Sequence, residues 1–305
     1  MENILNKVFE RHPIVHCITN YVTVNDVANV IIASGGSPIM SDDITEVEEI
    51  VNISDGLVIN IGTLNKRTVE SMILAGNVAN KKGIPVIFDP VGAGASSFRN
   101  ETVKRLLDEI EFSIIKGNSS EIKFMTGVSG KSRGVDVSFD NVISSDNIEG
   151  FISIAKKLSE LTNATVVMSG EIDIVAKKDK AALIRNGHSM MAKITGSGCM
   201  LAGILGVYAA ASGNDVKSVS TALSAFGLSG ELAYKKTLSN DEGNSSFRNH
   251  LIDYMSKMNF KKTPCAVWVK KNGLTGCLGK NDADTAKTIQ NLNRTEANTS
   301  MGRRV

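Results

Sequence analysis

The sequence predicts a doubly wound α/β fold, in which a mostly parallel sheet carries helices on both faces. Short apolar segments typical of buried strands alternate with longer segments whose apolar residues recur at helical spacing. Strands that alternate with helices of this length are typical of parallel βαβ units. In such folds ligands bind beyond the carboxyl ends of the strands, so the residues that follow each predicted strand are the candidates for a functional site.

The predicted strands are short apolar runs at 37–40, 56–61, 84–88, 112–115, 165–168, 172–176 and 182–185. The predicted helices are apolar on one face or throughout, and two of them end near glycine. They cover 24–32, 69–83, 103–110, 198–211 and 219–234. Thr45 and Glu48 have the spacing of a capping box, which predicts that a further helix begins there.

The amino-acid composition limits the classes of protein to which this chain can belong. The 305 residues are 42% hydrophobic and 22% charged, as in a soluble globular protein with a large core. The net charge of +2 argues against a nucleic-acid binder, and the apolar run 200–211 is too short to span a bilayer. The four cysteines lack zinc-binding or disulfide spacing, and the N-terminus lacks a signal-peptide core. We therefore expect a reduced, cytoplasmic protein with neither nucleic acid nor membrane as a partner.

The chain is expected to form one domain over residues 1–260, followed by a C-terminal extension over 261–305. The extension has few helix or strand signals and ends in a polar run rich in Asn and Thr, which favours partial disorder. The segment 127–146 is rich in Gly, Ser, Asp and Asn and is predicted to be a surface excursion.

The most informative segment is 193–201, which reads KITGSGCML and opens the apolar helix. A glycine-rich turn at a helix N-terminus presents backbone N–H groups to one point, where the helix dipole favours an anion. The predicted anion site comprises Gly196, Ser197, Gly198 and Cys199. The same field is expected to lower the pKa of the Cys199 thiol. The alternative is a structural turn beside a buried cysteine, since free cysteine is often buried.

Residues that can carry chemistry follow several predicted strands. Met40, Asp89, Lys116 and Ser169 each stand at or just after the end of one. Because ligands of such folds bind at the carboxyl ends of the strands, these residues are expected to meet the glycine-rich turn at one edge of the sheet. That edge would combine an acid, a cation and an anion-binding turn.

Asp89 and Glu121 are candidates to hold Mg²⁺, directly or through water, and Lys116 is a candidate contact for nucleotide phosphate. Each has a structural alternative. Asp89 precedes a proline, as turn residues do, and Asn118 with Glu121 has the spacing of a helix-capping box. Ser169 is compatible with a phosphate contact or with a plain turn.

Two common nucleotide motifs do not match. Before Gly130-Lys131-Ser132, Met125 stands where a P-loop needs glycine, and no apolar strand leads into it. Leu201 stands where a dinucleotide fingerprint starting at Gly196 needs its third glycine. An NAD-dependent oxidoreductase is therefore poorly supported.

Further motifs occur in order along the chain: PIVHCITNYVT at 13–23, ND at 25–26, ASGGSPIM at 33–40, DPVGAG at 89–94, KGNSSE at 116–121, NGH at 186–188 and TGSGC at 195–199. Together they closely resemble hydroxyethylthiazole kinase, a ribokinase-like family that serves thiamine salvage. The resemblance covers about residues 5–258. It implies that ATP and Mg²⁺ are used to phosphorylate the hydroxyethyl side chain of a thiazole alcohol. It also implies a homotrimer with active sites at subunit interfaces.

The resemblance assigns a role to each candidate residue. It implies thiazole contacts at Asn25, Met40 and Gly196, ATP contacts at Lys116 and Ser169, magnesium and phosphate contacts at Asp89 and Glu121, and the catalytic group at Cys199. Most ribokinase-like relatives carry an aspartate at the position of Cys199. A thiolate there can accept the alcohol proton as a carboxylate does, although less well, so we expect a modest turnover number.

The sequence departs from the family pattern at 243–247, which reads GNSSF where a Gly-Pro-Gly-like turn is usual, and in the extension. Two alternatives to the thiazole kinase stay open. The first is a kinase for another small heterocyclic alcohol such as a pyrimidine, against which Cys199 and the 15–20 segment count. The second is a nucleotide-binding protein without activity that is regulated by its extension, for which ATP binding without turnover would be the evidence.

Overall fold

The computed structural model describes residues 2–127, 143, 147–258, 267–270 and 273–276. The strands are β1 (Ile14–Ile18), β2 (Ser37–Met40), β3 (Gly56–Asn60), β4 (Val86–Asp89), β5 (Ile114–Asn118), β6 (Thr165–Ser169), β7 (Asp173–Lys177), β8 (Lys180–Ile184), β9 (Val267–Lys270) and β10 (Gly273–Gly276). They form one sheet in the order β10-β9-β8-β7-β6-β5-β4-β3-β1-β2. Strands β1 to β6 pair in parallel, and β7 to β10 continue the sheet by antiparallel pairing.

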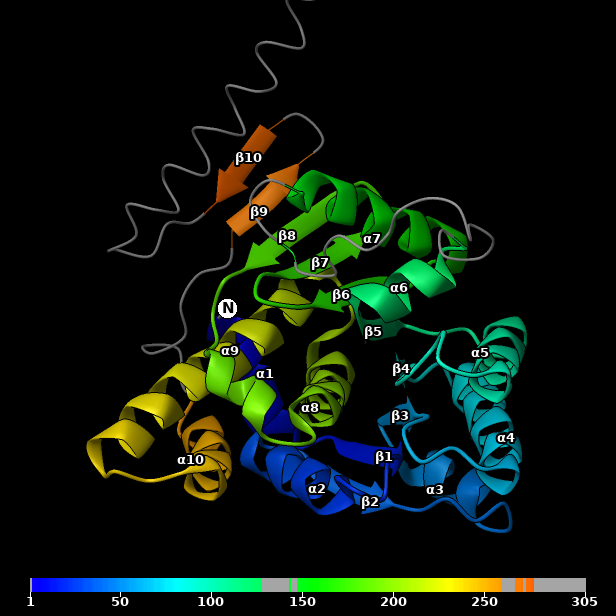
Figure 1. Cartoon of the computed structure of the whole chain (residues 1–305). Helices are drawn as coiled ribbons and strands as arrows, with labels where there is room; N and C mark the ends of the chain where they lie inside the picture. Colours follow the sequence, from blue (N-terminus) through cyan, green and yellow to red (C-terminus); the bar gives the residue numbers. More distant parts are fainter. Residues whose placement is uncertain (1, 128–142, 144–146, 259–266, 271–272, 277–305) are drawn as a thin grey trace, which may run out of the picture.

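The helices are α1 (Glu2–Arg11), α2 (Val24–Ala33), α3 (Val47–Ile53), α4 (Lys66–Lys82), α5 (Ser97–Glu109), α6 (Ser119–Met125), α7 (Ile148–Thr162), the 3₁₀-helix η1 (Ser189–Lys193), α8 (Ser197–Ser212), α9 (Val216–Ser239) and α10 (Asn244–Ser256). One apolar cluster joins α1, α2, α8, α9 and α10 to one face of the sheet, and a second joins α3 to α7 to the other face. Figure 1 shows the two groups of helices on opposite sides of the strands. The predicted doubly wound fold is confirmed.

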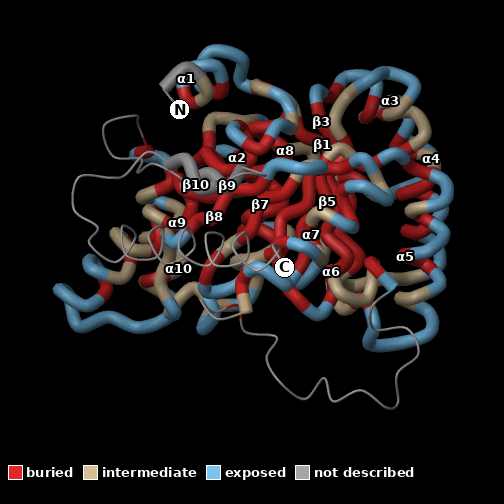
Figure 2. The backbone as a smooth tube through the Cα atoms, turned by 90° about the horizontal axis from the view of Figure 1, so that it is seen from above, coloured by how far each residue is buried: buried red, intermediate tan, exposed pale blue. Residues whose placement is uncertain are grey.

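The core lies along the central strands, where Figure 2 shows buried residues concentrated. Strand β3 is buried at every position, and helix α8 is buried from Cys199 to Ala209. This explains why these segments read as continuous apolar runs in the sequence. A strand covered on both faces has no solvent side on which polar residues could alternate. Among the described helices, none combines the length and apolar character needed to cross a membrane.

The sequence analysis missed β1 and the helices α1 and α7. The polar His16 interrupts the apolar run of β1, yet it is fully buried and bonds through Nε2 to the Ser41 carbonyl at 2.8 Å. The stripe Phe151, Ile152, Ala155 and Leu158 of α7 has helical spacing and was a readable signal.

The predicted capping box at Thr45 is wrong. Helix α3 begins at Val47, and the Thr45 backbone N–H and hydroxyl both donate to Asp43 Oδ1, at 3.0 and 2.7 Å. Asp43 therefore forms a local turn that occupies the Thr45 hydroxyl before the helix starts.

The C-terminal extension contributes to the sheet. Strand β9 pairs antiparallel with β8, and β10 pairs antiparallel with β9. This differs from the expectation that the extension carries few strand signals. The remaining residues of 261–305, and most of the predicted surface excursion at 127–146, lie outside the described residues. Ile143, which is described, packs into the core on the α7 side.

Candidate active site

The glycine-rich turn meets α8 where the sequence predicted it. Gly196 is the N-cap residue, with φ of +86°, and a Cβ at this position would lie 2.5 Å from Thr23 Cγ2. A Cβ on Gly198 would lie 2.9 Å from Lys116 Nζ. Gly196 therefore requires glycine both for its backbone conformation and for space, whereas a side chain at position 198 would displace the end of Lys116. The first backbone N–H groups of a helix lack intrahelical partners, so this turn offers donors beside a lysine ammonium.

Lys116 and Asp89 form a buried ion pair beside this turn. Lys116 Nζ lies 3.2 Å from Asp89 Oδ1, and the two side chains are 6% and 0% exposed. Asp89 ends β4, and Lys116 lies in the middle of the neighbouring strand β5, two residues before that strand ends rather than just after it as the sequence predicted. Burial raises the pKa of Asp89, and the Lys116 charge opposes that rise. The predicted meeting of an acid, a cation and the glycine-rich turn is thus observed in the geometry.

Asn60, which the sequence analysis missed, joins the two halves of this cluster. It ends β3 directly opposite Asp89 of β4 in the strand register. Its Nδ2 donates to Asp89 Oδ2 at 2.7 Å and to Cys199 Sγ at 3.3 Å. The sequence did contain a signal for Asn60, because it is a polar residue at the end of an apolar strand. The same criterion singled out Asp89.

The predicted low pKa of Cys199 is wrong. Burial and the Asp89 carboxylate raise the pKa of this thiol, and these effects outweigh its hydrogen bonds with Thr23 and Asn60 and the charge of Lys116. Cys199 does lie in the first turn of α8, as expected, but its side chain is only 8% exposed. Desolvation of a thiolate is costly, so the neutral thiol is favoured at this place.

Glu121 caps helix α6, as the structural alternative predicted. Its Oε2 accepts from the Asn118 backbone N–H at 2.7 Å, while the Glu121 N–H donates to Asn118 Oδ1 at 2.9 Å. Its Oε1 accepts from the Gly92 N–H at 2.8 Å. Glu121 therefore also ties the loop after β4 to the start of α6.

The acidic residues fit a magnesium ion that is held mainly by water and phosphate. Glu121 is close enough to Asp89 for its charge to contribute to the raised pKa of Asp89. Across the described ranges, no group of three or more His, Cys, Asp and Glu side chains forms a preformed metal cage. Mg²⁺ commonly keeps several waters and uses one or two carboxylates together with substrate phosphates. Asp89 and Glu121 supply that number of carboxylates.

A cavity of about 820 Å³ adjoins the glycine-rich turn. It is lined by the β6–β7 turn, the segment after β8, η1, the start of α8 and the middle of α9. Ser169 borders one side, where its hydroxyl donates to the Gly117 carbonyl at 3.3 Å, and Ser197 and Gly198 border another. The volume lies within the usual range for small-molecule and cofactor sites.

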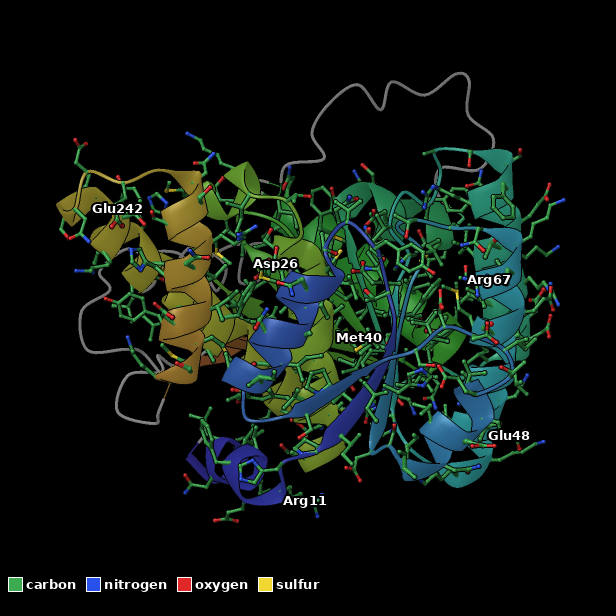
Figure 3. The ribbon with its side chains drawn as sticks, turned by 90° about the horizontal axis from the view of Figure 1, so that it is seen from below. Arg11, Asp26, Met40, Glu48, Arg67 and Glu242 are labelled. Atoms are coloured by element: carbon green, nitrogen blue, oxygen red, sulfur yellow. The ribbon has the colours of Figure 1, made fainter. Side chains whose placement is uncertain are left out.

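Asn25 and Met40 lie on the neighbouring elements α2 and β2. Asn25 is exposed and accepts a hydrogen bond from Asn29 Nδ2 at 3.1 Å. Met40 is half-buried against the core on the α8 side, and Figure 3 shows it at the end of β2 beside α2. Thr23, the N-cap residue of α2, packs on Gly196, so the start of α2 lies next to the glycine-rich turn.

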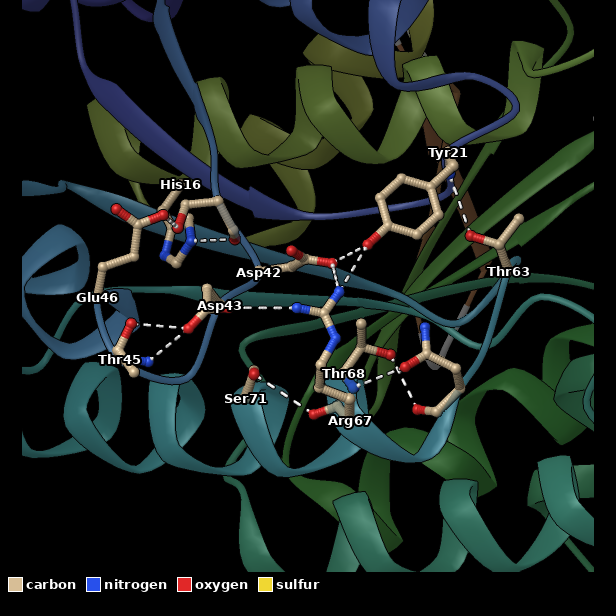
Figure 4. Close-up of polar contacts among 12 residues, drawn as sticks. His16, Tyr21, Asp42, Asp43, Thr45, Glu46, Thr63, Arg67, Thr68 and Ser71 are labelled. Carbon is tan, nitrogen blue, oxygen red and sulfur yellow. Dashed lines mark hydrogen bonds and ion pairs between the residues drawn. The ribbon is translucent and has the colours of Figure 1, made fainter.

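An exposed polar cluster organises the loops beyond β1 and β2. Arg67 Nη2 lies 3.3 Å from the Tyr21 hydroxyl and 3.4 Å from Asp42 Oδ2, and Arg67 Nη1 lies 3.4 Å from Asp43 Oδ2. The Tyr21 hydroxyl also donates to Asp42. Figure 4 shows these side chains converging from both loops and from α4. The cluster holds the loops at the same edge of the sheet as the site.

Comparison with known proteins identifies the family. The model of the hydroxyethylthiazole kinase family matches residues 5–261. A hydroxyethylthiazole kinase from Desulfovibrio desulfuricans is 50% identical over 262 residues, covering 83% of this chain and 92% of the relative. The chain belongs to the hydroxyethylthiazole kinase family. A second family member, from Clostridium acetobutylicum, is 48% identical over 250 residues, covering 82% of this chain and 91% of the relative. The resemblance seen in the sequence motifs is confirmed, and the chain is a kinase.

Solved structures agree with this assignment. The structure of a hydroxyethylthiazole kinase protein from Pyrococcus horikoshii superposes with a TM-score of 0.75 at 33% identity, covering 85% of this chain and 94% of that one. A ribokinase-like superfamily protein from Enterococcus faecalis has a TM-score of 0.58 at 12% identity, covering 84% of this chain and 94% of that one. The second likeness concerns the fold, which is ribokinase-like.

Proposed function

We propose that this member of the hydroxyethylthiazole kinase family transfers the terminal phosphoryl group of ATP to the hydroxyl of 4-methyl-5-(2-hydroxyethyl)thiazole, in thiamine salvage. The observation that carries the proposal is the first turn of α8. There a backbone anion site, the Lys116 ammonium and the Cys199 sulfur converge beside a cavity of about 820 Å³. Family membership and the names of the relatives point to the same reaction.

The proposed ATP site is the cavity together with the glycine-rich turn. Ser169 and Lys116 would contact the nucleotide, and the N–H groups from Gly196 to Cys199 would receive the charge that develops on the transferred phosphoryl group. Lys116 needs no large movement for this role, because its Nζ already lies against Gly198. The ammonium is held there by Asp89.

Asp89 and Glu121 are proposed to hold Mg²⁺ through water. The bound metal would neutralise charge on the phosphates of ATP. Glu121 keeps both carboxylate oxygens bonded to backbone N–H groups, so its capping role and a water-mediated metal contact are compatible.

Cys199 is proposed to accept the proton of the substrate hydroxyl. Its raised pKa means that the thiol form predominates at neutral pH, so the competent thiolate is a minor species whose fraction grows with pH. This gives a physical reason for a modest turnover number near pH 7. Asn25, Met40 and Gly196 are proposed to hold the thiazole alcohol so that its hydroxyl faces the sulfur.

We further propose a cytoplasmic homotrimer with active sites between subunits. The support is the exposure of Asn25 on α2 together with four exposed apolar side chains, which lie just before α2, on α2 itself and in the loop after β2. Tyr21, Val22, Ile32 and Ile44 are 51%, 67%, 60% and 45% exposed. Light scattering on the purified protein measures the mass directly. A monomer that turns over at full rate would rule out the interfacial site.

The first experiment is ADP release from Mg-ATP with and without 4-methyl-5-(2-hydroxyethyl)thiazole, with a pyrimidine alcohol as the control acceptor. Release that depends on the thiazole supports the substrate and the reaction together. Release with the pyrimidine instead would favour a different heterocycle. ATP binding without turnover of any alcohol would favour an inactive nucleotide binder.

A further inference from the structure

Asn60 has a hydrogen-bond environment that admits one orientation of its amide. Its Oδ1 accepts from the Gly62 backbone N–H at 2.8 Å, which leaves Nδ2 facing two acceptors, Asp89 Oδ2 and Cys199 Sγ. The reversed amide would place its oxygen against a carboxylate oxygen and its NH₂ against an N–H. The side chain is 1% exposed, so water could not compensate either repulsion.

Arg99 fixes the backbone next to Asn60 through hydrogen bonds. The Arg99 guanidinium donates to the carbonyls of Ile61, Gly62 and Val91, the last two at 2.7 Å. It thereby ties the loop after β3 to the loop after β4. Gly62 fits closely under Asn20, since a Cβ there would lie 2.1 Å from Asn20 Nδ2. The Asn60 side chain therefore extends from a backbone that is fixed by hydrogen bonds, and both of its amide hydrogens are directed into the site.

We infer that Asn60 is a positioning residue that sets the place of the Cys199 sulfur relative to the Lys116–Asp89 pair. Its amide joins the residue proposed to accept the alcohol proton to the ion pair proposed to face the phosphates. This inference rests on the proposed function, because the sulfur needs a fixed direction only if a hydroxyl must approach it.

In the step that Asn60 serves, the substrate hydroxyl loses its proton to the Cys199 thiolate while its oxygen forms the new bond to the terminal phosphorus of ATP. The bond from that phosphorus to the bridging oxygen breaks, and ADP leaves with the electron pair. The thiol then returns the proton to solvent before the next turnover. An N–H directed at sulfur stabilises the thiolate at the start of this step, and hydrogen bonds to charged groups are stronger than those to neutral ones.

The test compares Asn60→Leu, which removes both donors at similar size, with Asn60→Asp, which replaces the donor by an acceptor. Asn80→Leu is the matched control. The Asn80 amide is also bonded at both ends, to the backbone of Glu111 at 2.8 Å, but it lies at the end of α4 and outside the site. Three measurements are made on each variant: steady-state kinetics with the thiazole alcohol, which give kcat and KM, equilibrium ATP binding, and the pH midpoint of iodoacetamide alkylation at the Cys199 peptide. Thermal unfolding is followed for all variants.

In both Asn60 variants we expect kcat to fall at least about tenfold, the size expected for one hydrogen bond to a charged acceptor. ATP binding should stay within about threefold of wild type, and the alkylation midpoint should move to higher pH. Asn80→Leu should lose stability without changing the kinetics, the ATP binding or the alkylation midpoint. If Asn60→Leu does not fold, the smaller neutral variant Asn60→Ala decides the matter by the same measurements, because the new charge of Asn60→Asp would raise the thiol pKa by itself.

An unchanged alkylation midpoint, even with reduced kcat, would overturn the inference, because Asn60 would then act on the fold or on Asp89 alone. Failure of the proposed function is a separate result. It would appear as a wild-type protein without thiazole-dependent ADP release, whereas the alkylation midpoint tests the hydrogen bond to sulfur without any turnover.

Discussion

Lys116 Nζ lies 3.2 Å from Asp89 Oδ1, and neither side chain has more than 6% exposure. Removing one partner of such a pair leaves a buried charge, which typically costs about 3–5 kcal/mol of stability. Replacing both partners with apolar residues often leaves the stability of the fold unchanged. The pair therefore offers a way to separate the stability of this edge of the sheet from its chemistry.

Lys116→Met should lower the free energy of unfolding by about 3 kcal/mol and weaken ATP binding. The double variant Lys116→Met with Asp89→Leu should regain most of that stability while remaining inactive. Urea unfolding and ATP titration measure the two effects. A double variant that turned over at the wild-type rate would show that neither residue takes part in the mechanism.

The pH dependence of Cys199 follows from its raised pKa. Because burial and Asp89 raise the pKa above the ordinary thiol value of about 8.5, kcat and Cys199 alkylation should both increase from pH 7 to beyond pH 9. Cys17 is an internal control, since burial raises its pKa to about 12 and it should stay unmodified. A carboxyl group titrates several pH units below a thiol, so in Cys199→Asp the rise of kcat should move to lower pH and flatten between pH 7 and 9. A wild-type kcat that does not change between pH 7 and 9 would contradict the role of the Cys199 thiolate as proton acceptor.

Cys199→Ala should reduce turnover far more than it reduces ATP binding. The variant removes the proposed proton acceptor but leaves the backbone N–H groups of the α8 turn in place. General-base catalysis contributes about 10²–10⁴-fold, so kcat should fall by that order. Near-normal turnover in Cys199→Ala would show that the sulfur is not the base.

Gly196→Ala should disrupt the turn through contact with Thr23. Gly83→Ala is the control, because Gly83 has a similar φ of +74° but a Cβ there would meet nothing within 4 Å. The control should lose about 1–2 kcal/mol for the left-handed backbone alone. Gly196→Ala should lose more stability and most of its activity, and adding Thr23→Ser, which removes the clashing Cγ2, should recover part of both. Equal losses in the two single variants would mean that Thr23 does not constrain the turn.

A chain that ends at residue 260 should keep its kinase activity, since the family model matches through residue 261. The truncation removes β9 and exposes the edge strand β8, so aggregation at high concentration is the expected cost. Light scattering and ADP release measure the two effects. Loss of turnover in a soluble truncated chain would give the extension a functional role.

The fold class, most of the strands and the grouping of the candidate site residues at one edge of the sheet could be predicted from the sequence alone. Buried strands and amphipathic helices have local periodicities, and the glycine-rich turn before α8 has a local backbone requirement. These signals can be recognised in the sequence without knowledge of the tertiary contacts. Asp89, Lys116 and the glycines could be grouped because parallel strands bring their carboxyl ends to one edge.

The hydrogen bonds of Asn60 and the direction of the Cys199 pKa shift could be seen only in the folded structure. Asn60 and Cys199 are 139 positions apart in the chain, and nothing local to either predicts a hydrogen bond between them. The helix terminus favours a thiolate at Cys199, but burial and the Asp89 charge act in the opposite direction. Desolvation and charge proximity depend on the atoms that folding brings around a group, so a sequence pattern determines where the thiol lies but not how readily it ionises.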